Sequence, residues 1–95
     1  MDYKKGECIN TFEGHTRYIS TIVFIPGRNL LASSSEDQTI RIWSLKNGDC
    51  LSVWQAHVGR IFSMAVSDDG DYIASGGEDR LIKIWEIDTG RRIKT

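Results

Sequence analysis

The sequence lacks the features that define membrane, secreted and nucleic-acid-binding proteins. Its longest apolar run, residues 22–25, is far shorter than the ~20 residues that a transmembrane helix needs. Residues 1–5 are charged at several positions and precede no apolar segment typical of a signal peptide. The formal net charge is -1 and basic residues are spread along the chain, so there is no basic stripe for nucleic-acid phosphates. We therefore expect a cytoplasmic protein with no membrane and no nucleic-acid partner.

Cysteine and histidine are also scarce, with two residues of each type. Cys8 and Cys50 lie 42 residues apart, at the same phase of the repeat described below, which predicts equivalent strands of different units and no disulfide between them. Neither the cysteines nor the histidines have the short paired spacing of a zinc site. The sequence therefore predicts no metal and no cofactor.

What the sequence does contain is an internal repeat with an offset of 42 residues and no gap. Residues 6–47 align with residues 48–89 at eleven identical positions. The identical pairs are Gly6/Gly48, Cys8/Cys50, His15/His57, Ile19/Ile61, Ala32/Ala74, Ser33/Ser75, Glu36/Glu78, Asp37/Asp79, Ile40/Ile82, Ile42/Ile84 and Trp43/Trp85. A self-match at such a period is typical of a repeat architecture.

Each copy contains short runs that favour β-strands, separated by turn-forming clusters and without helical periodicity. We predict strands near residues 8–12, 19–25, 30–34, 39–45, 50–54, 61–66, 72–76, 81–87 and 92–95. The first strand of each repeat is apolar on both of its faces, whereas the last strand mixes polar and apolar residues. This gradient predicts four-stranded antiparallel sheets whose first strand is covered on both sides.

Particular motifs in both copies resemble those of the WD-repeat family. The motifs are Gly14-His15, Leu31-Ala32-Ser33, Glu36-Asp37 and Thr39-Ile40-Arg41-Ile42-Trp43 in the first copy, and Ile73-Ala74-Ser75-Gly76-Gly77-Glu78-Asp79 with Ile82-Lys83-Ile84-Trp85 in the second. The copies depart from the family pattern in Trp43-Ser44, Trp85-Glu86 and Ala56-His57. The resemblance implies an all-β fold of two four-stranded antiparallel β-propeller blades, as part of a larger or oligomeric propeller.

The repeat boundaries divide the chain into three predicted segments. Residues 1–12 are expected to form the outer strand of a preceding blade, residues 13–54 a first WD-repeat blade, and residues 55–95 a second blade with a truncated outer strand. Two blades would leave two apolar outer faces larger than a stable monomer exposes. Since propellers have about four to eight blades, we expect a homo-oligomer, such as a trimer or a tetramer, or further blades in a longer chain.

The resemblance also implies a hydrogen-bonded structural tetrad in each blade. The two sets are His15, Ser33, Asp37 and Trp43, and His57, Ser75, Asp79 and Trp85. In such a tetrad the indole donates to the hydroxyl, the hydroxyl to the imidazole, and the imidazole to the carboxylate. A Ser-His-Asp set also suggests a hydrolase triad. However, the set recurs once per repeat and neither serine lies in a nucleophile-elbow motif, so we predict no catalytic residue.

In an antiparallel meander, the loop entering the first strand and the loop joining the second and third strands lie on one rim. The resemblance implies that proteins or peptides dock on this rim. The candidate partner-binding residues are Thr16, Arg17, Tyr18, Glu36, Val58, Arg60 and Glu78. The sequence thus predicts a non-catalytic protein–protein interaction scaffold. The alternatives are a self-assembling propeller fragment and a sensor segment of a larger regulatory NTPase.

Overall fold

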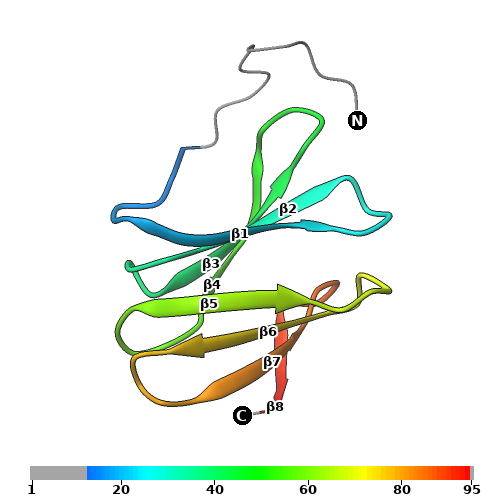
Figure 1. Cartoon of the computed structure of the whole chain (residues 1–95). Coiled ribbons are helices and arrows are strands. Elements are labelled where there is room, and N and C mark those ends of the chain that lie inside the picture. The colour runs from blue at the N-terminus through cyan, green and yellow to red at the C-terminus, as the bar shows by residue number, and fades with distance from the viewer. Residues whose placement is uncertain (1–12, 95) are drawn as a thin grey trace.

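The computed structural model describes residues 13–94, which form two four-stranded antiparallel sheets (Figure 1). The first sheet, here called blade 1, contains β1 (Ile19–Ile25), β2 (Leu30–Ser35), β3 (Thr39–Ser44) and β4 (Cys50–Gln55). The second sheet, blade 2, contains β5 (Ile61–Val66), β6 (Tyr72–Gly77), β7 (Ile82–Glu86) and β8 (Arg91–Lys94). The predicted all-β fold is confirmed. The predicted strand near residues 8–12, and the outer strand assigned to residues 1–12, lie outside the described residues.

Each blade is a meander in which strands that are consecutive in sequence are neighbours in the sheet. The register of the first strand pair shifts at equivalent places, between Ile19 and Thr21 in blade 1 and between Ile61 and Ser63 in blade 2. The two bulges are therefore 42 residues apart, like the sequence repeat. Within residues 13–94, no helix is long and apolar enough to cross a lipid bilayer.

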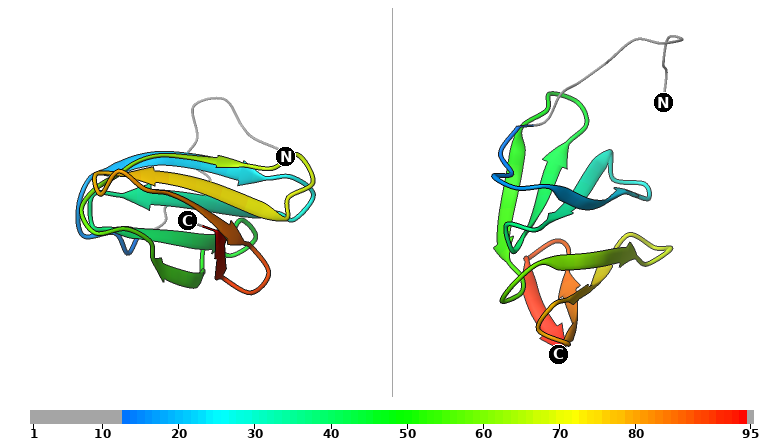
Figure 2. Two further views of the ribbon diagram at one scale, coloured as in Figure 1. Left: turned by 90° about the horizontal axis from the view of Figure 1, so that it is seen from below. Right: turned by 60° about the vertical axis from the view of Figure 1, so that its left-hand side comes forward.

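The two blades pack against each other, with β1 lying beside β5 (Figures 1 and 2). A single apolar core fills the interface. Its buried members are Ile25, Ala32, Ile40, Ile42, Trp54 and Ala56 from the first half of the chain, and Ile61, Met64, Ile73, Trp85 and Ile87 from the second. Because burying one large aliphatic side chain contributes about 1.5–3 kcal/mol, this interface is a main source of stability for the pair of blades.

Polar contacts reinforce the interface at the rim that carries the β1–β2 turn. The Arg28 guanidinium contacts the carboxylates of Asp88 and Asp71, with 2.8 Å between Arg28 Nη2 and Asp71 Oδ1. The hydrogen bond to Asp88 is the main cause of a raised pKa for Arg28. Beside this contact, a Cβ atom on Gly70 would lie 2.6 Å from the Pro26 carbonyl oxygen. Glycine at this position therefore permits the close approach of the two turns.

β1 is not covered on both faces, so that part of the sequence prediction is wrong. Ile25 is 3% exposed, whereas Ile22 and Phe24 on the opposite face are 60% and 56% exposed. Successive side chains of a strand point to opposite faces, and here only the face with Val23 and Ile25 packs into the core with blade 2. The prediction assumed a neighbouring sheet on both sides of β1, and the described residues supply one.

Candidate functional site: two polar tetrads and a loop rim

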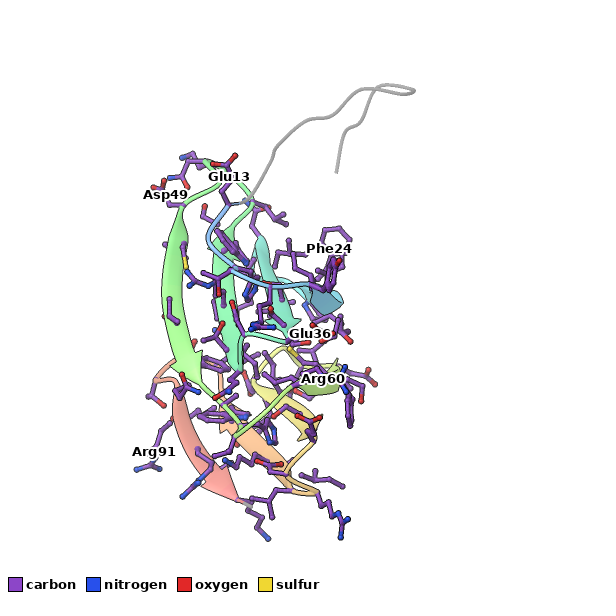
Figure 3. The ribbon with its side chains drawn as sticks, turned by 90° about the vertical axis from the view of Figure 1, so that its left-hand side faces the viewer. Glu13, Phe24, Glu36, Asp49, Arg60 and Arg91 are labelled. Carbon is purple, nitrogen blue, oxygen red and sulfur yellow. The ribbon has the colours of Figure 1, made fainter. Side chains whose placement is uncertain are left out.

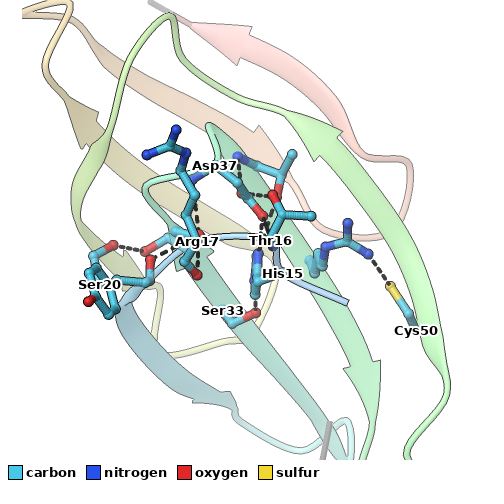
Figure 4. A network of polar contacts seen from close by, with 12 residues as sticks. His15, Thr16, Arg17, Ser20, Ser33, Asp37 and Cys50 are labelled. Atoms are coloured by element: carbon cyan, nitrogen blue, oxygen red, sulfur yellow. Dashed lines mark hydrogen bonds and ion pairs between the residues drawn. The ribbon is translucent and has the colours of Figure 1, made fainter. Parts of the chain in front are cut away.

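Four polar side chains of blade 1 form a continuous chain of hydrogen bonds. Figure 4 shows the part of it that joins Ser33, His15 and Asp37. The Trp43 indole Nε1–H donates to Ser33 Oγ at 2.8 Å, and Ser33 Oγ lies 2.6 Å from His15 Nε2. His15 Nδ1 lies 2.8 Å from Asp37 Oδ2. Because an ionised carboxylate only accepts, Nδ1 carries the proton and Nε2 accepts the serine hydroxyl hydrogen.

Blade 2 contains the same arrangement at positions 42 residues later. Trp85 Nε1–H donates to Ser75 Oγ at 3.0 Å, and Ser75 Oγ lies 2.8 Å from His57 Nε2. His57 Nδ1 lies 2.9 Å from Asp79 Oδ1, and His57 is 2% exposed. The structure thus brings together all eight residues that the sequence assigned to the two tetrads, through the same atoms in both blades.

Asp37 anchors the first tetrad to the surrounding loops. Besides the His15 ring, it binds the Thr39 hydroxyl at 2.5 Å, the Thr39 backbone N–H at 3.0 Å and the Thr16 backbone N–H at 3.1 Å. Burial alone raises the pKa of Asp37, but the hydrogen bonds from Thr39, His15 and Thr16 outweigh it and hold the pKa well below its ordinary value. Asp37 is therefore ionised at neutral pH and keeps the His15 tautomer fixed.

Asp79 has a similar role in the second blade with one donor fewer. It accepts from the backbone N–H groups of Leu81 at 3.1 Å and Val58 at 3.3 Å, and from His57. Burial raises the pKa of Asp79, but the hydrogen bonds from Leu81, His57 and Val58 together lower it by more, so the net shift of the pKa is downward. Leu81 occupies the position of Thr39, which explains the missing hydroxyl bond.

The tetrads share the residue types of a hydrolase triad but enclose the hydroxyl. Ser33 and Ser75 are each 2% exposed, and each Oγ is engaged by both an indole and an imidazole. A nucleophilic serine must reach a substrate carbonyl, and neither hydroxyl is placed to do so. No group of three or more His, Cys, Asp or Glu side chains among residues 13–94 is arranged to hold a metal ion.

The two tetrads occupy equivalent faces of their blades but different surroundings. In blade 2 the face with Ser75 and Trp85 packs against blade 1, where Lys83 Nζ donates to the Ala56 carbonyl at 2.7 Å. In blade 1, Ser33 lies opposite Ile22 in the sheet, on the face turned away from blade 2. One tetrad is therefore part of the inter-blade interface, and the other lies on an outer flank.

The candidate contact residues of blade 1 surround one shallow hollow on the rim above its tetrad. His15, Thr16, Arg17, Tyr18 and Glu36 line this hollow of about 470 Å³. The Glu36 backbone N–H donates to the Tyr18 carbonyl at 2.9 Å, so the two loops lie side by side. The Tyr18 side chain itself is free to meet a partner, because the residue is 81% exposed.

The candidate contact residues of blade 2 continue the same rim. The Glu78 backbone N–H donates to the Arg60 carbonyl at 2.8 Å, and Arg60 Nη2 lies 3.3 Å from Glu78 Oε2. Arg60 Nη1 also lies 3.6 Å from Glu36 Oε2 of blade 1 (Figure 3). Val58 beside them is 79% exposed. The Arg60–Glu36 pair joins the loops of the two blades into one rim surface.

Phe62 belongs to this surface and was not among the predicted contact residues. The Arg60 guanidinium carbon lies 5.6 Å from the centroid of the Phe62 ring, which is the geometry of a cation–π contact. Phe62 is 56% exposed. Its equivalent in the first repeat is Ser20, so the signal that would have identified it is a large apolar residue where the other copy has a small polar one.

Comparison with known proteins identifies the family of this chain. The family model described as "WD domain, G-beta repeat" matches residues 6–44 and residues 48–86. These two matches cover most of the chain and coincide with the sequence repeat. The chain therefore belongs to the WD-repeat family.

Single repeats of larger proteins match this chain. Nuclear distribution protein nudF 1 of Talaromyces marneffei is 50% identical over 44 residues, which are 46% of this chain and 9% of that protein. Transcription initiation factor TFIID subunit 5 of Drosophila melanogaster is 47% identical over 45 residues, 47% of this chain and 6% of that protein. Coatomer subunit beta' of Rattus norvegicus is 49% identical over 43 residues, 44% of this chain and 5% of that protein. The chain thus matches less than a tenth of the length of each.

Proposed function

We propose that this chain is a non-catalytic protein-interaction scaffold whose rim binds proteins or peptides. The observation that carries the proposal is the Arg60–Glu36 contact, which joins the exposed loops of two blades into a single surface. The proposed contact residues are Thr16, Arg17, Tyr18, Glu36, Val58, Arg60 and Glu78. Two relatives named as subunits, of coatomer and of TFIID, are consistent with a role in multiprotein assemblies.

The chemistry of the rim supports a protein partner. Arg60 lies within ion-pair distance of two carboxylates, Glu36 and Glu78, so its charge is largely compensated on the rim itself. Around it, Tyr18, Val58 and Phe62 expose apolar area. Tyrosine and arginine side chains are enriched among the residues that dominate protein–protein binding energy. A compensated arginine surrounded by exposed apolar side chains therefore suits a partner with a small apolar anchor.

We assign the tetrads a structural part in this function. Thr16 and Val58, the residues that follow the two histidines, donate their backbone N–H groups to the tetrad aspartates. The buried network below the rim thereby fixes the backbone of the loops above it. A loop that is already ordered loses less entropy on binding, so the tetrads would raise affinity without touching the partner.

The test is affinity capture by the purified chain, followed by binding measurements with each captured protein after its purification. We expect Tyr18→Ala with Arg60→Ala to lose the partner, since truncating an interface anchor costs about 2 kcal/mol or more, which is about thirty-fold in Kd. Lys46→Ala is the matched control, because Lys46 is exposed in the β3–β4 turn on the opposite rim. Equal binding by the double variant and the control would contradict the proposed contact surface.

Two further expectations remain predictions. A sensor segment of a larger regulatory NTPase would use the same rim, and it would be recognised by NTPase motifs in a longer sequence. A cytoplasmic location is tested by imaging the tagged protein in cells. Self-assembly, the other alternative, is supported by the exposed apolar side chains on the outer faces of the two blades, among them Ile22 and Ile82.

A further inference from the structure

The two outer flanks of the pair of blades correspond, residue for residue, to the two sides of the interface between the blades. We call the face of a blade that carries its tetrad the leading flank and the opposite face the trailing flank. In the interface, the leading flank of blade 2 packs on the trailing flank of blade 1. The leading flank of blade 1 and the trailing flank of blade 2 face outward.

The trailing flanks show the same side chains in two environments. Ile40 of blade 1 is fully buried in the interface, whereas its repeat equivalent Ile82 in blade 2 is 68% exposed. Ala32 is also fully buried, and its equivalent Ala74 is half-buried. The outward flank of blade 2 therefore presents an apolar surface of the kind that blade 1 buries.

In the leading flanks the burial is reversed: the residues of blade 2 are buried in the interface and their equivalents in blade 1 are exposed. Met64 of blade 2 is 7% exposed in the interface, whereas its repeat equivalent Ile22 in blade 1 is 60% exposed. Phe24 is 56% exposed, and its equivalent Val66 packs partly buried against the core. The outward flank of blade 1 therefore presents the apolar surface that blade 2 buries. One chain carries both halves of a second interface.

We propose that a second copy of this chain occupies these flanks, so that the leading flank of one copy packs on the trailing flank of the next. The two flanks differ in shape and sequence, so the contact is head to tail and not symmetric. Such contacts form rings when the rotation between copies closes. Since propellers have about four to eight blades, two-blade copies that close a ring form dimers, trimers or tetramers.

Polar contacts at the rims differ between the two kinds of interface. The equivalent of Arg28 is Gly70, so the Arg28 contacts with Asp71 and Asp88 have no counterpart between copies. At the opposite rim, the equivalents of Arg60 and Glu36 are Tyr18 and Glu78, which replaces an ion pair by a hydroxyl facing a carboxylate. Exposed ion pairs contribute about 0–1 kcal/mol each, so apolar burial determines whether the copies associate.

The test uses one variant for each flank and measures mass by size-exclusion chromatography with light scattering. Ile22→Asp places a carboxylate on the leading flank and Ile82→Asp on the trailing flank, where its burial in an apolar contact is strongly unfavourable. Both positions are exposed within one chain, so folding should persist, and circular dichroism checks this. Asn47→Asp is the control, since Asn47 is exposed in the β3–β4 turn and the new carboxylate keeps the acceptor for the Asp49 backbone N–H.

The wild-type chain and the control should have a mass two, three or four times 10.8 kDa. Each flank variant alone should be a monomer, because every contact needs one intact flank of each kind. A mixture of the two variants should give dimers and nothing larger, because only one intact leading flank and one intact trailing flank remain per pair. A monomeric wild type, a flank variant that still assembles, or a mixture that stays monomeric would each overturn the proposal. None of these outcomes depends on a rim partner.

Discussion

The indole ring of Trp54 in blade 1 stacks on the indole ring of Trp85 in blade 2, with centroids 5.4 Å apart and ring planes 16° apart. Trp85 also donates its N–H to Ser75, so this stack connects the outer strand of one blade to the tetrad of the next. A Cβ atom on Gly90 would lie 2.6 Å from Trp54 Nε1, which shows how closely blade 2 surrounds the ring. The inter-blade interface is thus both apolar and geometrically specific.

Removing this ring should destabilise the whole pair of blades. Trp54→Ala should lower the free energy of unfolding by ~3–5 kcal/mol, because it deletes a buried aromatic side chain and leaves a cavity. Urea unfolding at one protein concentration measures the change. Leu51→Ala on the same strand is the control, since Leu51 is 55% exposed and its truncation should change stability by about 0.5 kcal/mol or less. Equal effects of the two substitutions would contradict the packing of Trp54.

The tetrad in blade 1 makes a second prediction about stability. Asp37→Ala should lower the free energy of unfolding by ~1–3 kcal/mol, because the His15 ring and the backbone N–H groups of Thr16 and Thr39 lose their acceptor. Thermal unfolding followed by circular dichroism measures this loss. The control is Asp49→Ala, an exposed position in the turn before β4. An unchanged melting temperature for Asp37→Ala would rule out the anchoring role of Asp37.

The pKa of Asp37 also predicts how stability depends on pH. Its folded-state pKa is held below its unfolded-state value of about 3.9, so the unfolded chain binds the proton more readily. The resulting stabilisation is present above about pH 4 and is lost as the pH falls further. Thr39→Val removes the hydroxyl bond to Asp37, so it should reduce the loss of stability between about pH 5 and about pH 3. Urea unfolding at both pH values measures it.

Thr21→Val is the control for the pH experiment, since the same change of side chain is made in β1, away from either tetrad carboxylate. Thr21→Val should lose as much free energy of unfolding between the two pH values as the wild type does. If Thr39→Val lost as much unfolding free energy between the two pH values as the wild type, the Thr39 hydroxyl would not be what lowers the pKa of Asp37.

Two adjacent glycines at the end of β6 give a matched pair of substitutions. A Cβ atom on Gly77 would lie 2.8 Å from the Cγ atom of the His57 ring and 3.1 Å from the Arg60 carbonyl oxygen, whereas one on Gly76 would meet nothing within 4 Å. Gly77→Ala should therefore destabilise the chain by ~1–3 kcal/mol through overpacking. Gly76→Ala should be neutral or slightly stabilising. Chemical unfolding measures the free energy of unfolding of both variants. Similar values for Gly77→Ala and Gly76→Ala would contradict the close packing of His57 against β6.

The sequence was sufficient to predict the features that recur in both repeats. The β-favouring runs between turn-forming clusters located the strands to within a residue or two at most ends. The resemblance of both copies to WD repeats pointed to His15, Ser33, Asp37 and Trp43, which the fold brings together. This succeeds because repeated positions have the same neighbours in each blade. A pattern present twice therefore indicates a shared local environment.

Features that depend on a single copy were not predicted. Trp54 looked like a residue of a mixed outer strand, yet it is 7% exposed because its ring reaches across to the next blade. Ile22 looked like a buried position, yet it is 60% exposed because residues 13–94 supply no sheet on that side of β1. Burial in a repeat protein depends on which neighbours are present, and periodicity alone does not specify them.

The central claim is that consecutive repeats form adjacent sheets stacked through Trp54 and Trp85. Nuclear Overhauser effects between the two indole rings, in chain labelled selectively at tryptophan, test it most directly. The centroid separation of 5.4 Å predicts strong cross-peaks between ring protons of Trp54 and Trp85, which should vanish in Trp54→Ala. Well-resolved indole signals from a folded chain without any cross-peak between these two rings would contradict the stacked arrangement.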